Sequence, residues 1–242
     1  MRIEAATQLL AQHGWLSFTP ADFRKRVLAR IRLREFARGQ AVYLAGDPPG
    51  GPWVILAGAA KIEMPLPGTA PHFLHLVASG YWFGEAPLIV GNPRLVTVIT
   101  AQPSTLATLP LEDCQAILKA DPGAWRWIAL LSAMTTDLSL GVAVDSLLRD
   151  PAQRTAALLL RLAGVRSVFF PSKRALPIRL SQERLGQLVN LSRNSMTPIL
   201  RGFAKHGLIE MGYGSIRIAD IAALTARARA TRSGRRSTSR DP

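Results

Sequence analysis

The spacing of apolar residues divides the chain into a strand-rich middle with helical segments before and after it. From about residue 31 to residue 110, short apolar or alternating runs such as AVYLA, WVILAG and VTVIT are separated by Gly and Pro. Short strands with frequent turns are typical of an antiparallel sandwich or barrel, and not of a parallel sheet. Helical spacing returns at residues 111–120. We therefore expect an α+β protein.

A long helix is predicted over residues 122–148. One of its faces repeats at three- and four-residue steps and is formed by Trp127, Leu131, Met134, Leu138 and Val142. This stripe could pack on the chain's own β-domain or on the same helix of a second copy. Other apolar residues lie beyond the stripe: Ile128, Leu130, Leu140, Val144 and Leu147. They favour a homodimer seam. Asp150-Pro151 then ends the helix, and we expect an interdomain hinge there.

Two short helices joined by a tight turn are predicted over residues 180–209. Ser181 and Ser192 each precede a helix and can cap it, because a serine hydroxyl accepts a free backbone N–H of the first turn. Asn190 tolerates the left-handed conformation of a turn. The second helix has an apolar stripe of Met196, Ile199, Leu200 and Phe203. Its other side carries Asn194, Pro198, Arg201 and Lys205, with Thr197 beside them. Such a helix suits the major groove of DNA, whereas an ordinary helical hairpin would only expose this face to solvent.

The distribution of charge favours the DNA interpretation. Residues 1–150 hold 13 basic and 12 acidic side chains, a net charge of +1, whereas residues 151–242 hold 17 and 4, a net charge of +13. Nearly all of the net charge of +14 therefore lies on the part with the two-helix motif. A polyanion-binding module needs this asymmetry, and a solvated helix face does not. A nucleotide-responsive module that docks RNA or another polyanion is the alternative.

Composition excludes several classes of protein. The single cysteine, Cys114, excludes a disulfide framework, a four-cysteine iron–sulfur cluster and a cysteine-rich zinc site. His72 and His75 fall on opposite faces of a predicted strand, so no metal site is expected. The N-terminus is too polar for a signal peptide, and no apolar run is expected to span a membrane, which predicts a cytoplasmic protein. The sequence contains no recognisable catalytic triad, set of metal ligands or phosphate-binding loop, so an enzyme is not expected.

The order of these parts resembles the Crp/Fnr family of bacterial transcription regulators. The resemblance covers roughly residues 18–222 and is strongest at residues 180–209, with LSRNS at the start of the second helix and GLI before the wing. In the β-domain it rests on looser matches: Gly39, Gly46-Asp47, Trp53-Val54-Ile55, Gly58, Trp82-Phe83-Gly84-Glu85 and Pro93-Arg94. It implies a homodimer on palindromic double-stranded DNA, with RNA polymerase as a further partner.

The resemblance implies four parts. Residues 1–120 would form an antiparallel, jelly-roll-like β-roll that senses an effector, with short N-terminal helices, and residues 121–150 the long dimerisation helix and hinge. Residues 151–222 would form a winged helix-turn-helix, with a wing at EMGYGSIRIAD. Residues 223–242 are rich in arginine and poor in apolar residues, so we expect a disordered basic tail.

The resemblance also implies DNA contacts. Arg193 and Asn194 would contact base edges, which suits the bidentate pairing of Arg with guanine and of Asn with adenine. Phosphate contacts would come from Ser181, Ser192, Arg201 and Lys205. Pro198 departs from the family, which usually has a long polar or basic residue there. Because a proline costs about 3 kcal/mol inside a regular helix, we expect a kink or a loosened first turn. Base reading should then rest on Arg193, Asn194, Ser195 and Thr197.

Family members that bind cyclic AMP use a Gly-Glu turn and an arginine about ten residues later. Gly84, Glu85 and Arg94 occupy these positions, and Ser139 lies where binders present hydroxyls to the base. However, Leu95 stands where binders have a small or hydroxyl residue. We therefore favour a structural Glu85–Arg94 ion pair over a cyclic nucleotide site, and the effector is left open. An iron–sulfur cluster is excluded by the cysteine count.

Overall fold

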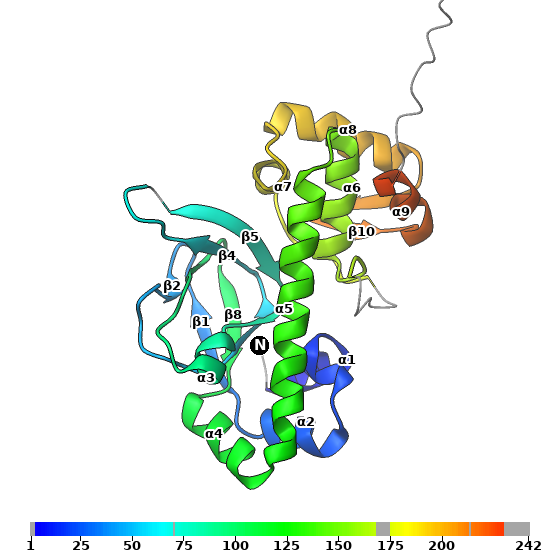
Figure 1. Cartoon of the computed structure of the whole chain (residues 1–242). Helices are drawn as coiled ribbons and strands as arrows, with labels where there is room; N and C mark the ends of the chain where they lie inside the picture. The colour runs from blue at the N-terminus through cyan, green and yellow to red at the C-terminus, as the bar shows by residue number, and fades with distance from the viewer. Residues whose placement is uncertain (1–2, 70, 168–174, 213, 230–242) are drawn as a thin grey trace, which may run out of the picture.

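The structure is a computed structural model that describes residues 3–69, 71–167, 175–212 and 214–229 of the chain. Figure 1 shows one long helix, α5 (Trp125–Ser146), running from the N-terminal helices past the β-domain to the C-terminal domain. The N-terminal helical elements are α1 (Ile3–Gln12), the 3-10 helix η1 (Trp15–Phe18) and α2 (Ala21–Leu28). The helix α5 therefore connects the predicted sensor and DNA-binding parts.

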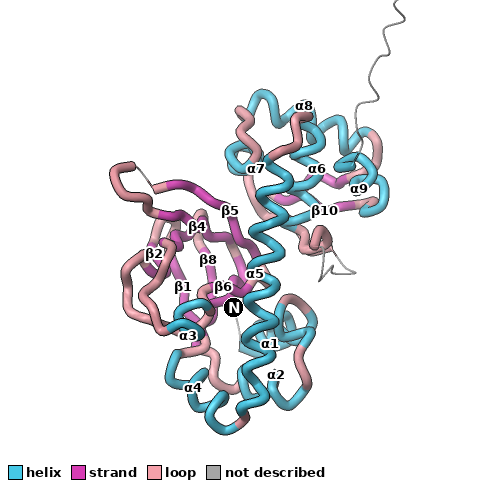
Figure 2. The backbone as a smooth tube through the Cα atoms, in the orientation of Figure 1, coloured by secondary structure: helices cyan, strands magenta, loops and turns pink. Residues whose placement is uncertain are grey.

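The β-domain consists of two antiparallel four-stranded sheets, as expected for a β-roll (Figure 2). One sheet has the order β1 (Arg32–Phe36), β8 (Ser104–Thr108), β3 (Trp53–Ala57) and β6 (Trp82–Phe83). The other has the order β2 (Ala41–Tyr43), β7 (Thr97–Thr100), β4 (Ala59–Met64) and β5 (His72–Ala78). The short helix α3 (Ala86–Val90) lies between β6 and β7 in the chain. The α+β class and the antiparallel β-roll are confirmed.

Strand β3 is buried on both of its faces, which explains its continuous apolar sequence. Ile55 is fully buried between the two sheets with Phe83 and Leu106. Val54 points to the other side, where it packs among the N-terminal helices, α4 (Leu111–Ala120) and α5. Each fully buried side chain of this size contributes about 1.5–3 kcal/mol to stability. The outer layer of helices is therefore part of the core and not an appendage.

The predicted stripe of α5 packs on the chain's own β-domain. Ile128 and Leu131 are buried, and Trp127 and Met134 are half-buried against the same cluster. A second set of apolar side chains stays exposed: Leu140 at 59%, Val144 at 58% and Leu147 at 78%. The helix therefore satisfies the first of the two predicted packing modes and still leaves an apolar face.

The expectation about membrane-spanning length was wrong. The helical stretch Pro122–Ser146, which joins the short 3-10 helix η2 (Pro122–Ala124) to α5, is long and apolar enough to cross a membrane by length and composition alone. Only part of this stretch is buried, because one face packs on the β-roll and the other is exposed.

The C-terminal domain contains a three-helix core and a two-stranded wing. Its elements are α6 (Pro151–Leu162), α7 (Gln182–Leu188), α8 (Arg193–Lys205), β9 (Ile209–Gly212), β10 (Ser215–Ile218) and α9 (Ile221–Arg229). Asp150 caps α6, since its Oδ1 accepts hydrogen bonds from the backbone nitrogens of Ala152 at 2.7 Å and Gln153 at 3.2 Å. The proline at the start of α6 lacks an N–H that would need a partner, so Asp150-Pro151 starts α6, whereas α5 already ends at Ser146. The predicted wing is present.

The expectation of a disordered tail from residue 223 was wrong for residues 223–229. These residues belong to α9, where Leu224 is fully buried and Ala228 is 2% exposed. The apolar spacing of Leu224 and Ala228 is one helical turn, which places both against the core of the domain. The arginines beside them concealed this short amphipathic pattern. The remainder of the expected tail, residues 230–242, lies outside the described residues.

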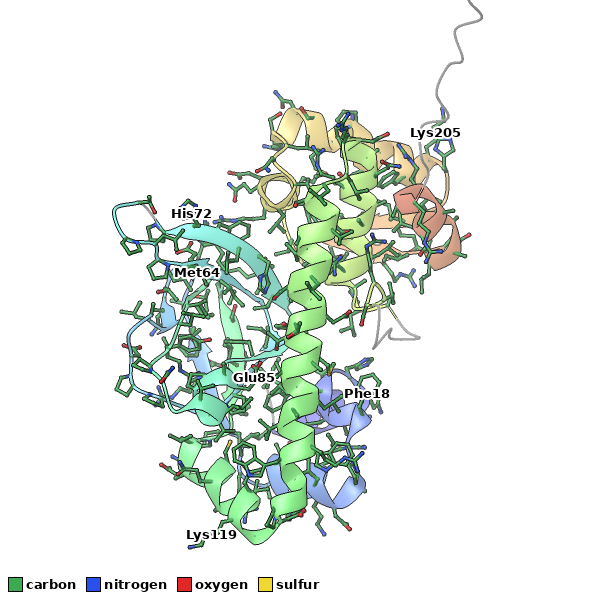
Figure 3. All side chains as sticks on the ribbon, in the orientation of Figure 1. Phe18, Met64, His72, Glu85, Lys119 and Lys205 are labelled. Atoms are coloured by element: carbon green, nitrogen blue, oxygen red, sulfur yellow. The ribbon has the colours of Figure 1, made fainter. Side chains whose placement is uncertain are left out.

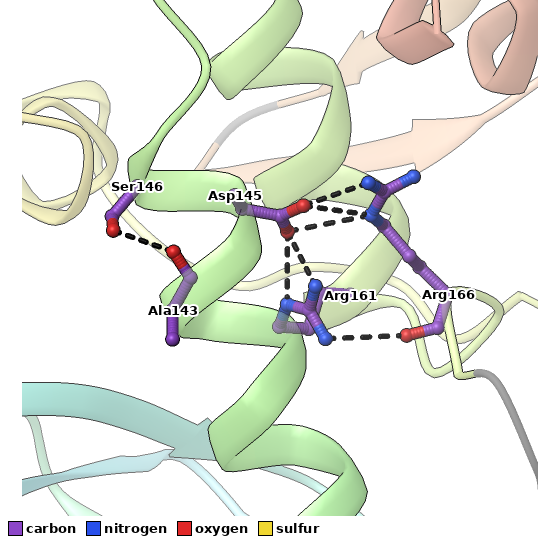
Figure 4. A network of polar contacts seen from close by, with 5 residues as sticks. All are labelled: Ala143, Asp145, Ser146, Arg161 and Arg166. Carbon is purple, nitrogen blue, oxygen red and sulfur yellow. Dashed lines mark hydrogen bonds and ion pairs between the residues drawn. The ribbon is translucent and has the colours of Figure 1, made fainter.

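Polar contacts tie α5 to the C-terminal domain (Figure 4). Asp145 of α5 accepts hydrogen bonds from Arg161 Nε at 3.2 Å and from Arg166 Nη2 at 2.7 Å. Gly141 leaves room for this arrangement, because a Cβ there would overlap the Arg161 guanidinium. One turn before Gly141, Asp137 accepts a hydrogen bond from Ser167. Two carboxylates of α5 therefore hold the end of α6 and the segment after it.

Acidification is expected to destabilise the β-domain through His75. Burial, aided by the positive charge of Arg161, lowers the pKa of His75 from 6.5 to about 4. The unfolded chain therefore binds a proton between these pH values and the folded chain does not, so stability falls as the pH falls through this window. The lost free energy of unfolding should be about 1–3 kcal/mol between pH 7 and pH 4. Urea unfolding of the native chain and of His75→Gln at several pH values checks this.

His72, which is exposed on the same strand (Figure 3), supplies the control. His72→Gln should keep the pH dependence of the native chain, whereas His75→Gln should flatten it. Equal pH dependence in both variants would contradict the role of His75.

Candidate DNA interface and effector site

The two-helix motif has the caps and the turn that the sequence predicts. Ser181 Oγ accepts a hydrogen bond from the backbone N–H of Arg184 at 3.2 Å. Ser192 Oγ accepts one from the backbone N–H of Ser195, also at 3.2 Å. Asn190 has a φ of 55°, which makes it the one non-glycine residue with positive φ among the described residues. The expected capping serines and left-handed turn are confirmed.

Helix α8 is apolar on one side and polar on the other. Met196 and Leu200 are fully buried and Phe203 is 5% exposed, so this side packs into the domain. The predicted contact residues on the other side are exposed: Arg193, Asn194, Ser195, Arg201 and Lys205. In the described part of the chain, no acidic group forms an ion pair with Arg193, Arg201 or Lys205. Their charges remain available to a polyanion.

Thr197 lies apart from this exposed group. Its Oγ1 lies 2.8 Å from Gln182 Oε1 of α7 and 2.9 Å from the Arg193 carbonyl oxygen, and the residue is half-buried. The hydroxyl hydrogen is therefore used inside the motif, while its oxygen can still accept a hydrogen bond. Thr197 therefore braces α7 against α8.

Pro198 does not interrupt α8. The helix is continuous from Arg193 to Lys205, and its first turn is fixed by the Ser192 cap, so the expected loosened first turn was wrong. The proline removes the bond to the Asn194 carbonyl, and its ring crowds that carbonyl. Asn194 and Pro198 are both exposed, so this carbonyl lies on the solvent side of the helix. An acceptor that water can reach costs far less than a buried one.

In the β-roll, the structure brings Gly84, Glu85 and Arg94 together. Arg94 Nη1 donates to the Gly84 carbonyl at 2.6 Å, and Nη2 donates to the Gly51 carbonyl at 2.9 Å. The guanidinium carbon lies 4.3 Å from the centre of the Tyr43 ring. Arg94 is only 6% exposed, and burial lowers the pKa of its guanidinium. The arginine is enclosed by backbone and one aromatic ring.

Glu85 has partners different from those that the sequence suggested. Its Oε1 accepts a hydrogen bond from Ser132 Oγ of α5 at 3.3 Å. Glu85 is 4% exposed, and burial raises the pKa of its carboxyl, against the effect of hydrogen bonds from Thr135 and Ser132 and of the Arg94 charge. The expected direct Glu85–Arg94 ion pair was wrong, because the two side chains interact electrostatically without an ion pair within 4.0 Å. Arg94 donates its hydrogen bonds to the backbone carbonyls of Gly84 and Gly51 instead of to Glu85.

Two further details correct the sequence interpretation of this site. Ser139 is exposed, and its hydroxyl donates to the Thr135 carbonyl of its own helix at 3.0 Å, so the structure does not bring it to Glu85. Ser132, two helical turns earlier, contacts Glu85, and the predicted contact of Ser139 with an effector stays a prediction. Leu95 is 70% exposed and does not fill the space beside Arg94.

Some site residues were missed by sequence reasoning. Tyr43 and the pair Gly50-Gly51 surround the Arg94 guanidinium, and a Cβ at Gly50 would overlap it. The Gly-Gly pair after two prolines was a visible turn signal, but only the fold places it opposite Arg94. Ser132 carried no signal distinct from that of the other hydroxyls of α5.

Two family models match the two parts of the chain. A cyclic nucleotide-binding domain matches residues 33–121, and a Crp-like helix-turn-helix domain matches residues 153–227. A cyclic nucleotide-binding domain joined through a long helix to a winged helix-turn-helix defines a transcription regulator with a DNA-binding domain. The chain belongs to the Crp/Fnr family of transcription regulators.

Known relatives span almost the same length. The CRP-like cAMP-activated global transcriptional regulator of Mycobacterium tuberculosis is 25% identical over 222 residues, which cover 92% of this chain and 99% of the relative. The cyclic AMP receptor protein of Thermus thermophilus is 22% identical and covers 81% of this chain and 88% of its own length. Both parts of the chain are therefore matched together in single proteins.

Solved structures share the fold. The structure of FixK2 from Bradyrhizobium japonicum has a TM-score of 0.64 at 14% identity and covers 83% of this chain and 98% of its own. A transcriptional regulator of the CRP family from Thermus thermophilus has a TM-score of 0.55 at 22% identity and covers 81% and 96%.

Proposed function

We propose that this transcription regulator acts as a cytoplasmic homodimer on a palindromic operator and responds to an effector bound in its β-roll. The observation that carries the operator proposal is the exposed N-terminal turn of α8, where Arg193 has no ion-pair partner among the described residues, in the part of the chain (residues 151–242) that has a net charge of +13. Base-reading side chains at the N-terminal end of a helix suit a major groove. A regulator of this kind needs no catalytic site, and RNA polymerase is its expected further partner.

The exposed side chains of α8 divide into two groups by chemistry. We assign base reading to Arg193 and Asn194, with Ser195 beside them, and leave Thr197 a bracing role. The phosphate contacts are assigned to Arg201 and Lys205 and to the two capping serines, Ser181 and Ser192. Figure 3 labels Lys205 at the outer edge of the domain, where a phosphate can approach. Phosphate contacts fix position and base contacts supply the specificity.

The exposed face of α5 supports the homodimer. Exposed positions follow one another at alternating four- and three-residue steps: Ala129, Ala133, Thr136, Leu140, Ala143 and Leu147. This is the seam spacing of a two-stranded coiled coil, and small residues in its first half allow close approach of a second helix. Residues 122–148 are therefore assigned to the contact between two copies.

A selection from random duplex DNA tests the proposed function. The bound pool should converge on a palindrome whose half-sites lie about one helical turn, or ~34 Å, apart. Sedimentation of the bound complex should give two chains per duplex. A pool without a palindrome, or equal retention of double-stranded RNA of the same length, would favour the polyanion-docking alternative instead.

Arg201→Ala is expected to weaken binding to all duplex sequences alike. The lost phosphate contact should also reduce the slope of log affinity against log salt by about one. Titrations by fluorescence anisotropy at several salt concentrations measure both quantities. Arg38→Ala, which removes an exposed arginine of the β-domain, is the control and should change neither. A loss confined to one operator sequence would contradict the phosphate role.

The effector that the β-roll supports best is a cyclic nucleotide. A single buried cation, Arg94, and a single carboxylate, Glu85, lie around one turn, which suits an anionic phosphate beside a ribose hydroxyl. Binding would require the Arg94 guanidinium to exchange the carbonyls of Gly84 and Gly51 for the phosphate. Ligand binding would therefore break the hydrogen bond from Arg94 to Gly84 and so affect the turn before α3.

Calorimetry with cyclic AMP and cyclic GMP tests the effector proposal. We expect saturable binding of one of them to the native chain and its loss in Arg94→Gln, with Arg38→Gln as the control. Because Arg94 also holds the turn, circular dichroism of the variant must first show an intact β-domain. Native chain that binds neither nucleotide would leave Arg94 with a structural role alone.

A further inference from the structure

Three charged side chains join the end of α5 to the C-terminal domain. Asp145 lies in the last turn of α5, and its carboxylate accepts hydrogen bonds from Arg161, in the last turn of α6, and from Arg166 (Figure 4). Arg166 Nε and Nη2 both donate to Asp145 Oδ1, at 3.1 Å and 2.7 Å. The side chains of Arg161 and Asp145 are only 9% and 13% exposed. The three side chains form one largely buried cluster, the interdomain clamp.

The guanidinium of Arg161 lies directly against the backbone of α5. A Cβ at Gly141 would lie 2.2 Å from Arg161 Nη1, so only a glycine leaves the space that this group occupies. A buried charge that loses its counter-ion is strongly unfavourable, because water cannot replace the lost partner. Arg161 can therefore leave Asp145 only if α6 moves away from α5 and water enters. The clamp opposes that movement.

The loop between the two helices does not fix the domain by itself. Helix α5 ends at Ser146 and α6 begins at Pro151, so residues 147–150 form the link. A short loop between helices can adopt more than one conformation. The clamp therefore supplies the contact that selects one orientation of α6 on α5.

The clamp and the proposed dimer seam occupy different faces of α5. Gly141 and Asp145 are four residues apart and share one face. The seam residues Leu140, Ala143 and Leu147 lie, on average, roughly 130° around the helix from Gly141. One α5 can therefore contact its twin on one face and its own C-terminal domain on another. In such a dimer, the direction of each α8 relative to the twofold axis depends on the clamp.

The clamp leaves the DNA-contact face of α8 free. Arg193, Asn194 and Arg201 are exposed while Asp145 holds its two arginines. DNA can therefore approach α8 without opening the clamp. This arrangement suits a contact that positions the domain, and not one that blocks it.

We propose that Asp145 is a positioning residue that fixes, through Arg161 and Arg166, the half-site spacing that the dimer accepts. The inference rests on the proposed homodimer on a palindromic operator. One inserted base pair moves a half-site by about 3.4 Å and rotates it by about 35° around the DNA axis. Two fixed copies of α8 match one spacing, whereas two loose domains match several with lower affinity, because binding must then order them.

A distance measurement between the domains tests the clamp without DNA. Nitroxide labels on Ala116→Cys of α4 and Ala226→Cys of α9, both exposed positions, report the separation of the domains. Cys114 is 1% exposed and stays unlabelled. Labelled chain is diluted with unlabelled chain, so that pulsed electron paramagnetic resonance measures distances within one chain. We expect a narrow distribution in the native chain and a broad one in Asp145→Asn. Equal widths would overturn the proposal.

A series of operators tests the spacing itself. The palindrome that the native chain selects is shortened or lengthened at its centre by one base pair, and affinities are measured by fluorescence anisotropy. The native chain should lose about tenfold on each altered operator, and Asp145→Asn less than about threefold. Asp145→Asn should also bind the unaltered operator about tenfold more weakly and keep the base preference of each half-site. Glu112→Gln, which removes one partner of the exposed Arg32–Glu112 pair, is the control and should match the native chain.

The outcomes separate this proposal from the proposed function. Folded Asp145→Asn that keeps the native spacing preference would overturn the role of Asp145. If the native chain selected no palindrome, the proposed function would fail, and the distance measurement would still decide whether the clamp fixes the domain.

Gly141→Ala disturbs the clamp without removing a charge. The new Cβ takes the place of the Arg161 guanidinium, while alanine favours a helix more than glycine does. We expect the same broadening of distances and of accepted spacings as in Asp145→Asn, with circular dichroism as the check that each variant is folded. Sedimentation should still give two chains per duplex. A variant that binds as one chain would show an effect on the dimer seam and would contradict the proposal.

Discussion

Replacing Gly186 with alanine should abolish operator binding and leave the β-roll folded. A Cβ at this position would lie 2.5 Å from the carbonyl oxygen of Leu191, in the turn between α7 and α8. That distance is shorter than any ordinary carbon–oxygen contact, and the atom it meets belongs to the backbone. The same turn is fixed by the Leu191 nitrogen, which donates to the Gly186 carbonyl at 2.9 Å. Neither side can move without breaking the turn.

The expected cost is about 2–3 kcal/mol of stability in the C-terminal domain, as for other overpacked sites in a rigid core. A shifted turn also misplaces the first turn of α8, so the operator affinity should fall more than about a hundredfold. Thermal unfolding and anisotropy measure the two effects.

Gly202→Ala is the matched control for this prediction. Gly202 lies inside α8, and a Cβ there would meet no atom within 4 Å. Alanine at an open helical position should therefore raise stability by up to about 1 kcal/mol. If Gly186→Ala were as stable as the native chain, the close approach of Gly186 to the Leu191 carbonyl would not require a glycine, and the prediction would be wrong.

Local signals account for the parts of the fold that the sequence predicted well. The serine caps, the left-handed Asn190 and the apolar stripe of α8 each depend on neighbours within one or two helical turns. The antiparallel β-roll was predicted from short apolar runs separated by Gly and Pro. In all of these cases, a few adjacent residues contain the physical cause.

Long-range contacts account for the parts that the sequence did not predict. Arg94 meets the Gly51 carbonyl, 43 positions away, and Glu85 meets Ser132, 47 positions away. The spacing of residues along the chain does not show which distant residues come into contact. Glu85 and Arg94 were therefore predicted to form an ion pair with each other. The contact of Thr197 with Gln182, 15 positions away, was not predicted either, and the role of Thr197 at DNA stays a prediction.

One helix, α5, contacts both halves of the chain. One face of α5 packs on the β-roll, Ser132 contacts Glu85, and Asp145 holds the two arginines at the end of α6. A shift of the Gly84–Glu85 turn would therefore reach α6 through a rigid element.

Arg193→Ala should lower affinity for the selected operator about 5- to 150-fold, equivalent to about 1–3 kcal/mol, and relax the preference at one base position of each half-site. Arg193 is the first residue of α8, it is exposed, and it has no ion-pair partner among the described residues. A planar guanidinium there can donate two parallel hydrogen bonds to one guanine, which no other base can accept in the same geometry. The measurement is a competition titration against all four bases at each operator position.

Arg193→Lys separates the two contributions of this side chain. Lysine keeps the positive charge but loses the bidentate geometry, so affinity for non-cognate DNA should stay close to that of the native chain while discrimination falls. Alanine should lose both. If either variant weakened every sequence by the same factor and kept the base preference intact, Arg193 would be a phosphate contact, and the base-reading role would pass to Asn194 and Ser195, its exposed neighbours on the same turn.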